Sequence, residues 1–408
     1  MSEQLAISGG IPVRDIQARP WSKWPLYDAT EEQALLRVLH SDQWWYVEGA
    51  EGKAFEEEFA AYQHAKHAVA CVNGTAALEI SLRALGVGCG DEVIVPPYTF
   101  IATASAVLTV SATPVFVDIE GDTLNIDPAK IEEAITPRTK AIIAVHIAGR
   151  PADMDGVMAV ARKHNLYVIE DAAQAPAAEW RGTKVGAIGD LGTFSFQASK
   201  NLNAGEGGII VSNNEELIEK AWSVTHVGRV RSGRWYQHEV LGGNYRMTEF
   251  QSAILRAQMA RLPAQTQKRL ENATYLRALL QSFEGVELPR EDPRITLHAN
   301  HLFTFRYKAE AFGGKTKAEL IEALIAEGIP CTSGYVPLYK ENVFAQAGQR
   351  KGAWCQTGRL MDYPNLNLPV CEQVCLENLW FFQQMLLGDS ADMEDIANAL
   401  AKIQRAWR

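Results

Sequence analysis

Lys200 is the residue of this 408-residue chain with the clearest capacity for covalent chemistry. It follows a short β-prone run, Thr193 to Gln197, in a loop of small and polar residues, and glycines at 205, 207 and 208 close that loop. Most lysines are solvated surface charges. A loop of this composition, however, lets the backbone approach a polar ligand closely. We therefore treat Lys200 as a candidate for amine chemistry that needs partners elsewhere.

A first possible partner is the sequence Asn73-Gly74-Thr75, which lies between a β-prone run and a helical pattern. Gly74 permits close backbone approach, Thr75 offers a hydroxyl, and the free N–H groups of a helix start favour an anion. This combination predicts a cradle for a phosphate or a carboxylate. An ordinary helix entry has the same residues, so the motif is not specific alone.

Two further groups follow other predicted strands, where ligands bind in open α/β sheets. Phe100 comes after Pro96-Pro97 and could stack on a flat ring, although core packing is the stronger explanation for an isolated aromatic. An apolar run ends in Glu170-Asp171, and a buried carboxylate there needs a cationic partner. A metal ion or a protonated ring nitrogen would serve.

Together these parts are a phosphate cradle, a ring stacker, an acid and a lysine. Pyridoxal 5′-phosphate is the cofactor that uses all four, with the lysine on its aldehyde and the acid on its ring nitrogen. The order of the motifs along the chain predicts this cofactor. We expect no metal site.

The elements that must position these residues alternate between β-prone and helical patterns from residue 54 onward. Short continuous apolar runs separated by helices predict an α/β fold with a mostly parallel sheet covered on both faces. The last two strands are joined too briefly for a covered crossover, so one of them should be antiparallel. Seven strands are expected, at 68–72, 92–95, 114–118, 140–145, 166–170, 193–197 and 207–212.

Length and pattern predict two domains. We place a large domain at 1–260, including an N-terminal arm at 1–30, and a smaller α+β domain at 261–408. The latter has a predicted strand at 302–307 and helices at 316–327 and 392–407, with irregular chain between 327 and 369.

Composition excludes several functions. The formal net charge of −10 argues against nucleic acid and against anionic membranes as partners. The N-terminus has no secretion signal, no apolar run approaches a membrane span, and the six cysteines form no Cys-x-x-Cys pair. We expect a cytoplasmic protein with reduced thiols.

The motifs as a set resemble the DegT/DnrJ/EryC1/StrS aminotransferases, which are fold-type I enzymes dependent on pyridoxal phosphate. The resemblance rests on Asn-Gly-Thr-Ala-Ala at 73–77, Pro-Pro-Tyr-Thr-Phe at 96–100, Glu-Asp-Ala-Ala-Gln at 170–174, Ser-Phe-Gln-Ala-Ser-Lys at 195–200 and Gly-Asn-Tyr-Arg-Met at 243–247. It covers roughly residues 20 to 405.

The resemblance assigns roles by position. Lys200 would form the Schiff base and Asp171 would hold the ring nitrogen. Gln174 would contact the ring hydroxyl and Phe100 the ring face. The phosphate would lie against Gly74, Thr75 and Ser195. Asn244 would reach the phosphate of a second subunit, which implies a homodimer with shared active sites.

The implied reaction moves an amino group from L-glutamine or L-glutamate to the ketone of a keto-cyclitol or a keto-sugar, which could be nucleotide-linked. Many nucleotide-sugar members have Ser-Phe-His before the lysine, whereas this chain has Gln197, as in the cyclitol and aminohydroxybenzoate branch that uses glutamine. Of Arg229, Arg231 and Arg234, at least two are expected to be solvated, and His146 and His226 to be structural. The alternatives are elimination or dehydration on the same fold, and a non-catalytic regulator.

Overall fold

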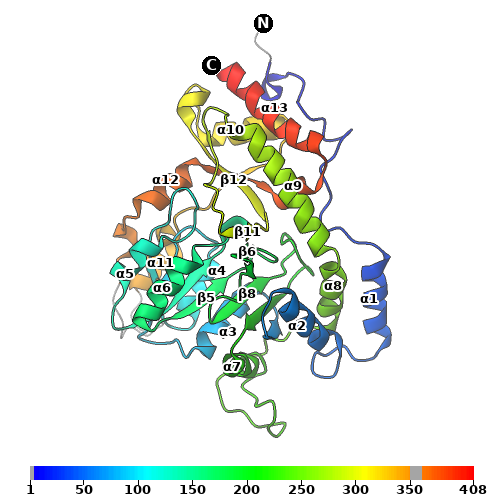
Figure 1. Ribbon diagram of the computed structural model, residues 1–408, viewed down its shortest axis with the longest axis vertical. Helices are drawn as coiled ribbons and strands as arrows, with labels where there is room; N and C mark the ends of the chain where they lie inside the picture. Colours follow the sequence, from blue (N-terminus) through cyan, green and yellow to red (C-terminus); the bar gives the residue numbers. More distant parts are fainter. Residues whose placement is uncertain (1–3, 350–360) are drawn as a thin grey trace.

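A seven-stranded sheet forms the centre of the molecule (Figure 1). The computed structural model describes residues 4–349 and 361–408. The strand order is β1-β9-β8-β5-β4-β2-β3, and only β9 runs antiparallel to its neighbours. The strands are β1 His67–Cys71, β2 Glu92–Val95, β3 Thr113–Phe116, β4 Thr139–Val145, β5 Tyr167–Asp171, β8 Leu191–Ser195 and β9 Gly208–Ser212. The predicted mostly parallel seven-stranded sheet is confirmed.

Helices cover both faces of this sheet. They are α2 Glu51–Tyr62, α3 Gly74–Ala84, α4 Ala102–Thr109, α5 Pro128–Ala134, α6 Met154–His164, α7 Glu215–Thr225 and α8 Glu249–Met259. Helix α1 Ala29–His40 packs on α8. Two small strands, β6 Glu179–Trp180 and β7 Thr183–Lys184, pair with β11 Ile295–Leu297 in a separate three-stranded sheet.

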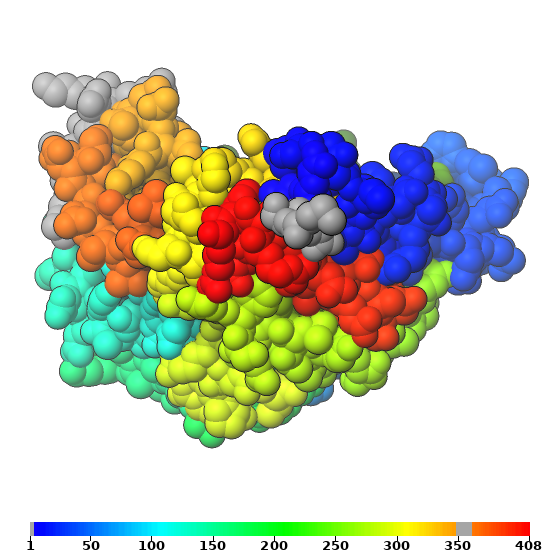
Figure 2. Space-filling view, turned by 90° about the horizontal axis from the view of Figure 1, so that it is seen from above, coloured from blue at the N-terminus to red at the C-terminus, as the bar shows by residue number. Residues whose placement is uncertain are grey.

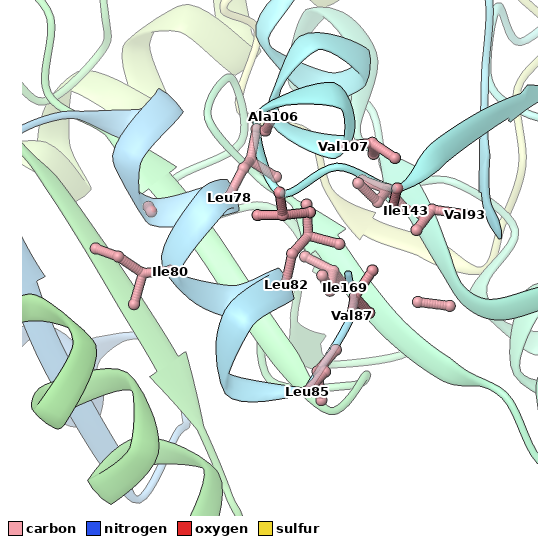
Figure 3. Packing of buried hydrophobic residues seen from close by; sticks show 14 of the residues in the cluster. Leu78, Ile80, Leu82, Leu85, Val87, Val93, Ala106, Val107, Ile143 and Ile169 are labelled. Atoms are coloured by element: carbon pink, nitrogen blue, oxygen red, sulfur yellow. The ribbon is translucent and has the colours of Figure 1, made fainter. Parts of the chain in front are cut away.

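Alternating residues of the central strands feed two separate cores, as expected when side chains point to opposite faces in turn. Ile143 and Ile169 pack under α3, α4 and α7, whereas the preceding Ile142 and Val168 pack with α2, α6 and α8. Figure 3 shows Leu78 and Leu82 of α3 lying between α4 and the sheet. Both faces are therefore buried, which explains the continuous apolar runs of the sequence.

A second, four-stranded antiparallel sheet lies toward the C-terminus in the order β10-β12-β14-β13. Its strands are β10 Val286–Glu287, β12 Leu302–Tyr307, β13 Thr332–Ser333 and β14 Asn378–Phe382. The remaining helices are α9 Leu262–Leu280, α10 Lys317–Ala326, α11 Asn342–Gln349, α12 Pro369–Glu377 and α13 Ser390–Trp407. A third core joins this sheet to α9, α10 and α13.

The N-terminal segment packs on the C-terminal helix (Figure 2). The buried Arg14 guanidinium lies 2.6 Å from Asp392 and 2.8 Å from Asp395, both on α13. A domain boundary near residue 260 stays a prediction, although α9 begins at Leu262.

No helix in residues 4–349 or 361–408 is long and apolar enough to cross a membrane. The cytoplasmic location stays a prediction. The expectation of reduced thiols holds for Cys71, Cys331, Cys371 and Cys375 and is wrong for Cys89, which is disulfide-bonded. Cys355 lies outside the described residues.

Candidate active site

The candidate residues gather at the carboxyl ends of β1, β5 and β8, which are part of one sheet edge. β8 lies between β5 and β9, and β9 pairs with β1. The loop after each strand therefore faces the same region of the molecule. This topology brings together residues that are far apart in the sequence.

Asp171 ends β5 as a buried carboxylate that no cation of the described chain pairs with directly. The Thr103 hydroxyl donates to its Oδ2 at 2.7 Å, and the Ala173 N–H donates to its Oδ1 at 3.2 Å. The Thr99 and Thr103 hydroxyl oxygens are 2.9 Å apart. Because Thr103 gives its proton to Asp171, Thr99 donates to Thr103. The two threonines hold the Asp171 carboxylate in place.

Lys200 lies close enough to Asp171 for the two charges to interact. Burial lowers the pKa of Lys200 to about 8, and the Asp171 carboxylate opposes that shift. The lysine is half-buried in its loop, where its N–H donates to the Gln197 carbonyl at 2.8 Å. An amine whose pKa is near neutral exchanges a proton readily under ordinary conditions.

Gly74 and Ser195 lie side by side at the start of α3, where the cradle was predicted. A Cβ on Gly74 would lie 2.7 Å from the Ser195 Cβ, so only glycine leaves this space open. The Asn73 side chain caps the helix by accepting from the Ala76 N–H at 2.8 Å. The N–H groups of Gly74 and the exposed Thr75 precede the first helical hydrogen bond, which makes them available to an anion.

Three other residues were predicted to contact the cofactor: Gln174, Phe100 and Asn244. Gln174 is buried, its Oε1 accepts from the Ala148 N–H at 2.6 Å, and its Nε2 donates to the Tyr335 hydroxyl at 2.9 Å. Phe100 has 56% of its surface exposed, so core packing does not account for it. Asn244 is exposed, and its side chain bonds to no described residue of its own chain.

Glu170, the neighbour of Asp171, has a structural role. It is fully buried and accepts hydrogen bonds from the N–H groups of Gly186, Ile188 and Gly189. His146 lies 3.0 Å from its Oε2. Because the Ala152 N–H donates to His146 Nδ1 at 3.0 Å, the imidazole proton is on Nε2 and points to Glu170. The prediction of a structural His146 agrees with this network.

Sequence reasoning missed four residues around the site: Thr103, Tyr335, His301 and Trp24. Tyr335 lies near Asp171, and its pKa is raised to about 12 mainly by burial. The His301 ring is 3.0 Å from Asn201 Oδ1, and burial, with the nearby Lys200 charge, lowers its pKa. Trp24 donates to the Ala198 carbonyl at 2.9 Å. For these four residues, the spacing of Thr99 and Thr103 was the one feature of the sequence that could have pointed to the site.

Gln197, which the sequence offered as a hint to the substrate, has a contact of its own. Its Oε1 accepts from the Ser199 N–H at 2.8 Å and from the Ser199 hydroxyl at 2.7 Å. It therefore shapes the loop that holds Lys200. Of the three arginines, Arg229 lies over Trp235 and Arg231 pairs with Glu219. Residues 4–349 and 361–408 contain no group of three or more side chains suited to a metal ion.

Known proteins resemble this chain in sequence and fold along almost its whole length. Residues 25–380 match the DegT/DnrJ/EryC1/StrS aminotransferase family. The L-glutamine:2-deoxy-scyllo-inosose aminotransferase of Streptoalloteichus tenebrarius is 40% identical, over 99% of this chain and 98% of that protein. The crystal structure of 3-amino-5-hydroxybenzoic acid synthase has a TM-score of 0.86 and 35% identity, over 94% of this chain and 98% of that one. DesV of S. venezuelae, solved with a ketimine intermediate, has a TM-score of 0.80 and 36% identity, over 91% of this chain and 93% of that one.

Proposed function

Because this chain belongs to the DegT/DnrJ/EryC1/StrS aminotransferase family, we propose that it transfers the amino group of L-glutamine to the ketone of a keto-cyclitol. The observation that carries the proposal is the 40% identity, over 99% of the chain, to an aminotransferase named for glutamine and 2-deoxy-scyllo-inosose. L-Glutamate as donor and a nucleotide-linked keto-sugar as acceptor are the competing choices. Gln197 and the named relatives favour glutamine and a cyclitol.

The site fits pyridoxal 5′-phosphate. The open space at Gly74, the start of α3 and Ser195 suit the phosphate. Asp171 is a buried carboxylate that needs a cationic partner, and a protonated ring nitrogen would supply one. Phe100 is exposed for the ring face, and Gln174 and Lys200 stand at the same sheet edge. When bound, this cofactor supplies an electron sink that takes up the electrons left when the Cα–H bond of the substrate breaks.

The residues of the chain then have distinct tasks. Asp171, held by Thr103, presents its carboxylate at a buried position. Lys200 has a pKa of about 8, so its free amine takes up and returns a proton near neutral pH. Trp24 and Asn201 hold the loop on either side of it, through Ala198 and Ala299. These contacts keep the amine at one position during turnover.

Isotope transfer tests the substrates. Holoenzyme is supplied with L-glutamine labelled with ¹⁵N at the α-amino group, or with labelled L-glutamate, and with either 2-deoxy-scyllo-inosose or a nucleotide-linked keto-sugar. We expect the label on the cyclitol, from glutamine in preference to glutamate, and none with Lys200→Ala. Label on the nucleotide-linked sugar alone would contradict the assignment. Release of ammonia without labelled amine would favour elimination.

We also propose that two copies of the chain complete each site. Asn244 is exposed, and so are Tyr236 and Leu241, at 83% and 82% of their surfaces. Arg246 supports this, because its Nε and Nη1 are buried and have no hydrogen-bond partner among the described residues. A buried, unpaired guanidinium is costly unless another group reaches it. A second subunit on this face would supply partners for these residues.

Mixed dimers test the shared site. Lys200→Ala and Asn244→Asp are each expected to be inactive as homodimers. In a mixed dimer, one of the two sites combines an intact Lys200 from one subunit with an intact Asn244 from the other. Mixing the two variants should therefore restore activity. No recovery in a dimer shown to be mixed, or full activity at a monomer mass, would contradict shared sites.

A further inference from the structure

A cavity of about 390 Å³ is lined by residues of α9, β11 and β12 and of the segments beside them. None of the residues proposed to hold the cofactor lines it. The segment 298–301 separates it from the active site, since Asn201 donates to the Ala299 carbonyl at 2.8 Å on the other side. The cavity is large enough for a small organic molecule.

Arg150 is the group that gives this cavity a chemical character. The residue is 93% buried, with 7% of its surface exposed, and it lines the cavity. Its Nη2 donates to the Arg290 carbonyl, whereas its Nε is buried without any partner. No carboxylate of the described chain forms an ion pair with it. A buried guanidinium in this state is costly to keep unless an anion reaches it.

The neighbouring polar groups add donors rather than acceptors. His298 Nδ1 accepts from the Asn300 N–H at 2.9 Å, which leaves the imidazole proton on Nε2. Burial, with the charges of Arg150 and Arg277, lowers the pKa of His298 to about 3, so the ring is a neutral donor. Arg277 also lines the cavity and is paired with Glu291, a residue whose side chain is 79% exposed.

Both acids at the cavity wall, Glu291 and Asp292, already pair with other arginines. Asp292 is bound by Arg294 through Nε at 3.0 Å and Nη2 at 2.7 Å. Its charge lies near Arg150 without pairing with it. The wall also has an apolar part, which includes Leu270, Ile295 and Phe303. The cavity therefore combines an unpaired cation and a neutral donor with an apolar surface.

We propose that this cavity binds a small organic carboxylate whose apolar body, about the size of one ring, packs between α9 and β12, with the carboxylate on Arg150 and His298. A planar guanidinium fork matches a carboxylate in shape and charge. The apolar residues of the wall favour a ligand with an apolar body, which inorganic anions and acetate lack. The exposed Thr274, also on the cavity wall, marks the solvent side of the entrance.

Calorimetry on the holoenzyme with benzoate tests the site. Benzamide keeps the ring without the charge, and acetate keeps the charge without the ring. We expect benzoate to bind and both analogues to bind at least about tenfold more weakly. Benzamide loses one charge-assisted hydrogen bond, and acetate loses the ring contact. Benzoate that does not bind, or that binds no more tightly than benzamide or acetate, overturns the proposal.

Three variants locate the binding. Arg150→Met removes the cation, and Thr274→Trp fills the entrance while leaving Arg150 in place. Arg162→Met is the matched control, because Arg162 is exposed and does not line the cavity. We expect the first two to weaken benzoate binding by about tenfold or more and the control to leave it unchanged. Wild-type affinity in either of the first two overturns the site. Thr274→Trp decides the matter if Arg150→Met fails to fold.

Discussion

Replacing Gly74 by alanine tests the cradle at the start of α3 most sharply. A Cβ at this position would lie 2.7 Å from the Ser195 Cβ and 3.3 Å from its Oγ. Carbon atoms that are not bonded prefer about 3.5 to 4.0 Å, so Ser195 or the helix must move. Gly88→Ala is the matched control, since the nearest atom to its Cβ would be the Val110 carbonyl oxygen at 3.8 Å.

Two effects of opposite sign act on the cofactor-free protein. Alanine restricts the unfolded chain more than glycine does, which favours folding by about 0.4–1 kcal/mol. Overpacking at Ser195 costs about 1–3 kcal/mol. The free energy of unfolding should therefore fall by about 1 kcal/mol in Gly74→Ala. Gly88→Ala lacks the overpacking and should be unchanged or slightly stabilised.

Cofactor binding should change more than stability. A displaced Ser195 hydroxyl no longer donates to the phosphate, and a hydrogen bond to a charged group contributes about 1.5–3 kcal/mol. The dissociation constant for pyridoxal phosphate should rise by about tenfold to a hundredfold. Titration of apoprotein, followed by the absorbance of the bound cofactor, measures this. Wild-type affinity in Gly74→Ala would refute the reasoning that the phosphate lies between Gly74 and Ser195.

Two further predictions concern the carboxylates at the end of β5. In Asp171→Asn apoprotein the Lys200 pKa should fall below its value of about 8, because the carboxylate that opposes the effect of burial is gone. NMR of ¹⁵N-lysine-labelled protein, assigned with Lys200→Ala, measures the titration, and a pKa that rises would contradict the placement of Asp171. In Glu170→Gln one carboxylate oxygen becomes an NH₂ group, which would face donors on either side: the Gly186 N–H and His146, or the N–H groups of Ile188 and Gly189. The free energy of unfolding should therefore fall by about 3 kcal/mol or more. Urea unfolding measures it against the exposed Glu57→Gln, and equal losses in the two variants would count against the buried network.

The central sheet was predictable because its signals are local. The buried strands are continuous apolar runs between helical patterns. In the C-terminal sheet, the predicted strand 302–307 is observed as β12 at the same residues. β14 was missed, although it pairs with both β12 and β13. Its sequence, Asn-Leu-Trp-Phe-Phe, is a short apolar run after an apolar helix, and such a run does not separate strand from helix.

The site was predictable only where a motif is contiguous. Lys200, Asp171 and Gly74 lie in motifs whose residue types indicate their chemistry. Tyr335 and His301 have no local signal, because they reach the site through folding of distant segments. The cavity at Arg150 was unreadable for the same reason, since its wall joins residues 150, 270–277 and 289–304.

The attachment of the cofactor tests the central claim most directly. Holoenzyme is treated with borohydride, which fixes the cofactor to the amine that holds it, and the digested protein is analysed by mass spectrometry. The account predicts a pyridoxyl group on Lys200 and on no other lysine, and none after treatment with L-glutamine, which releases the amine. A pyridoxyl group on a different lysine, or none on the untreated holoenzyme, would contradict it.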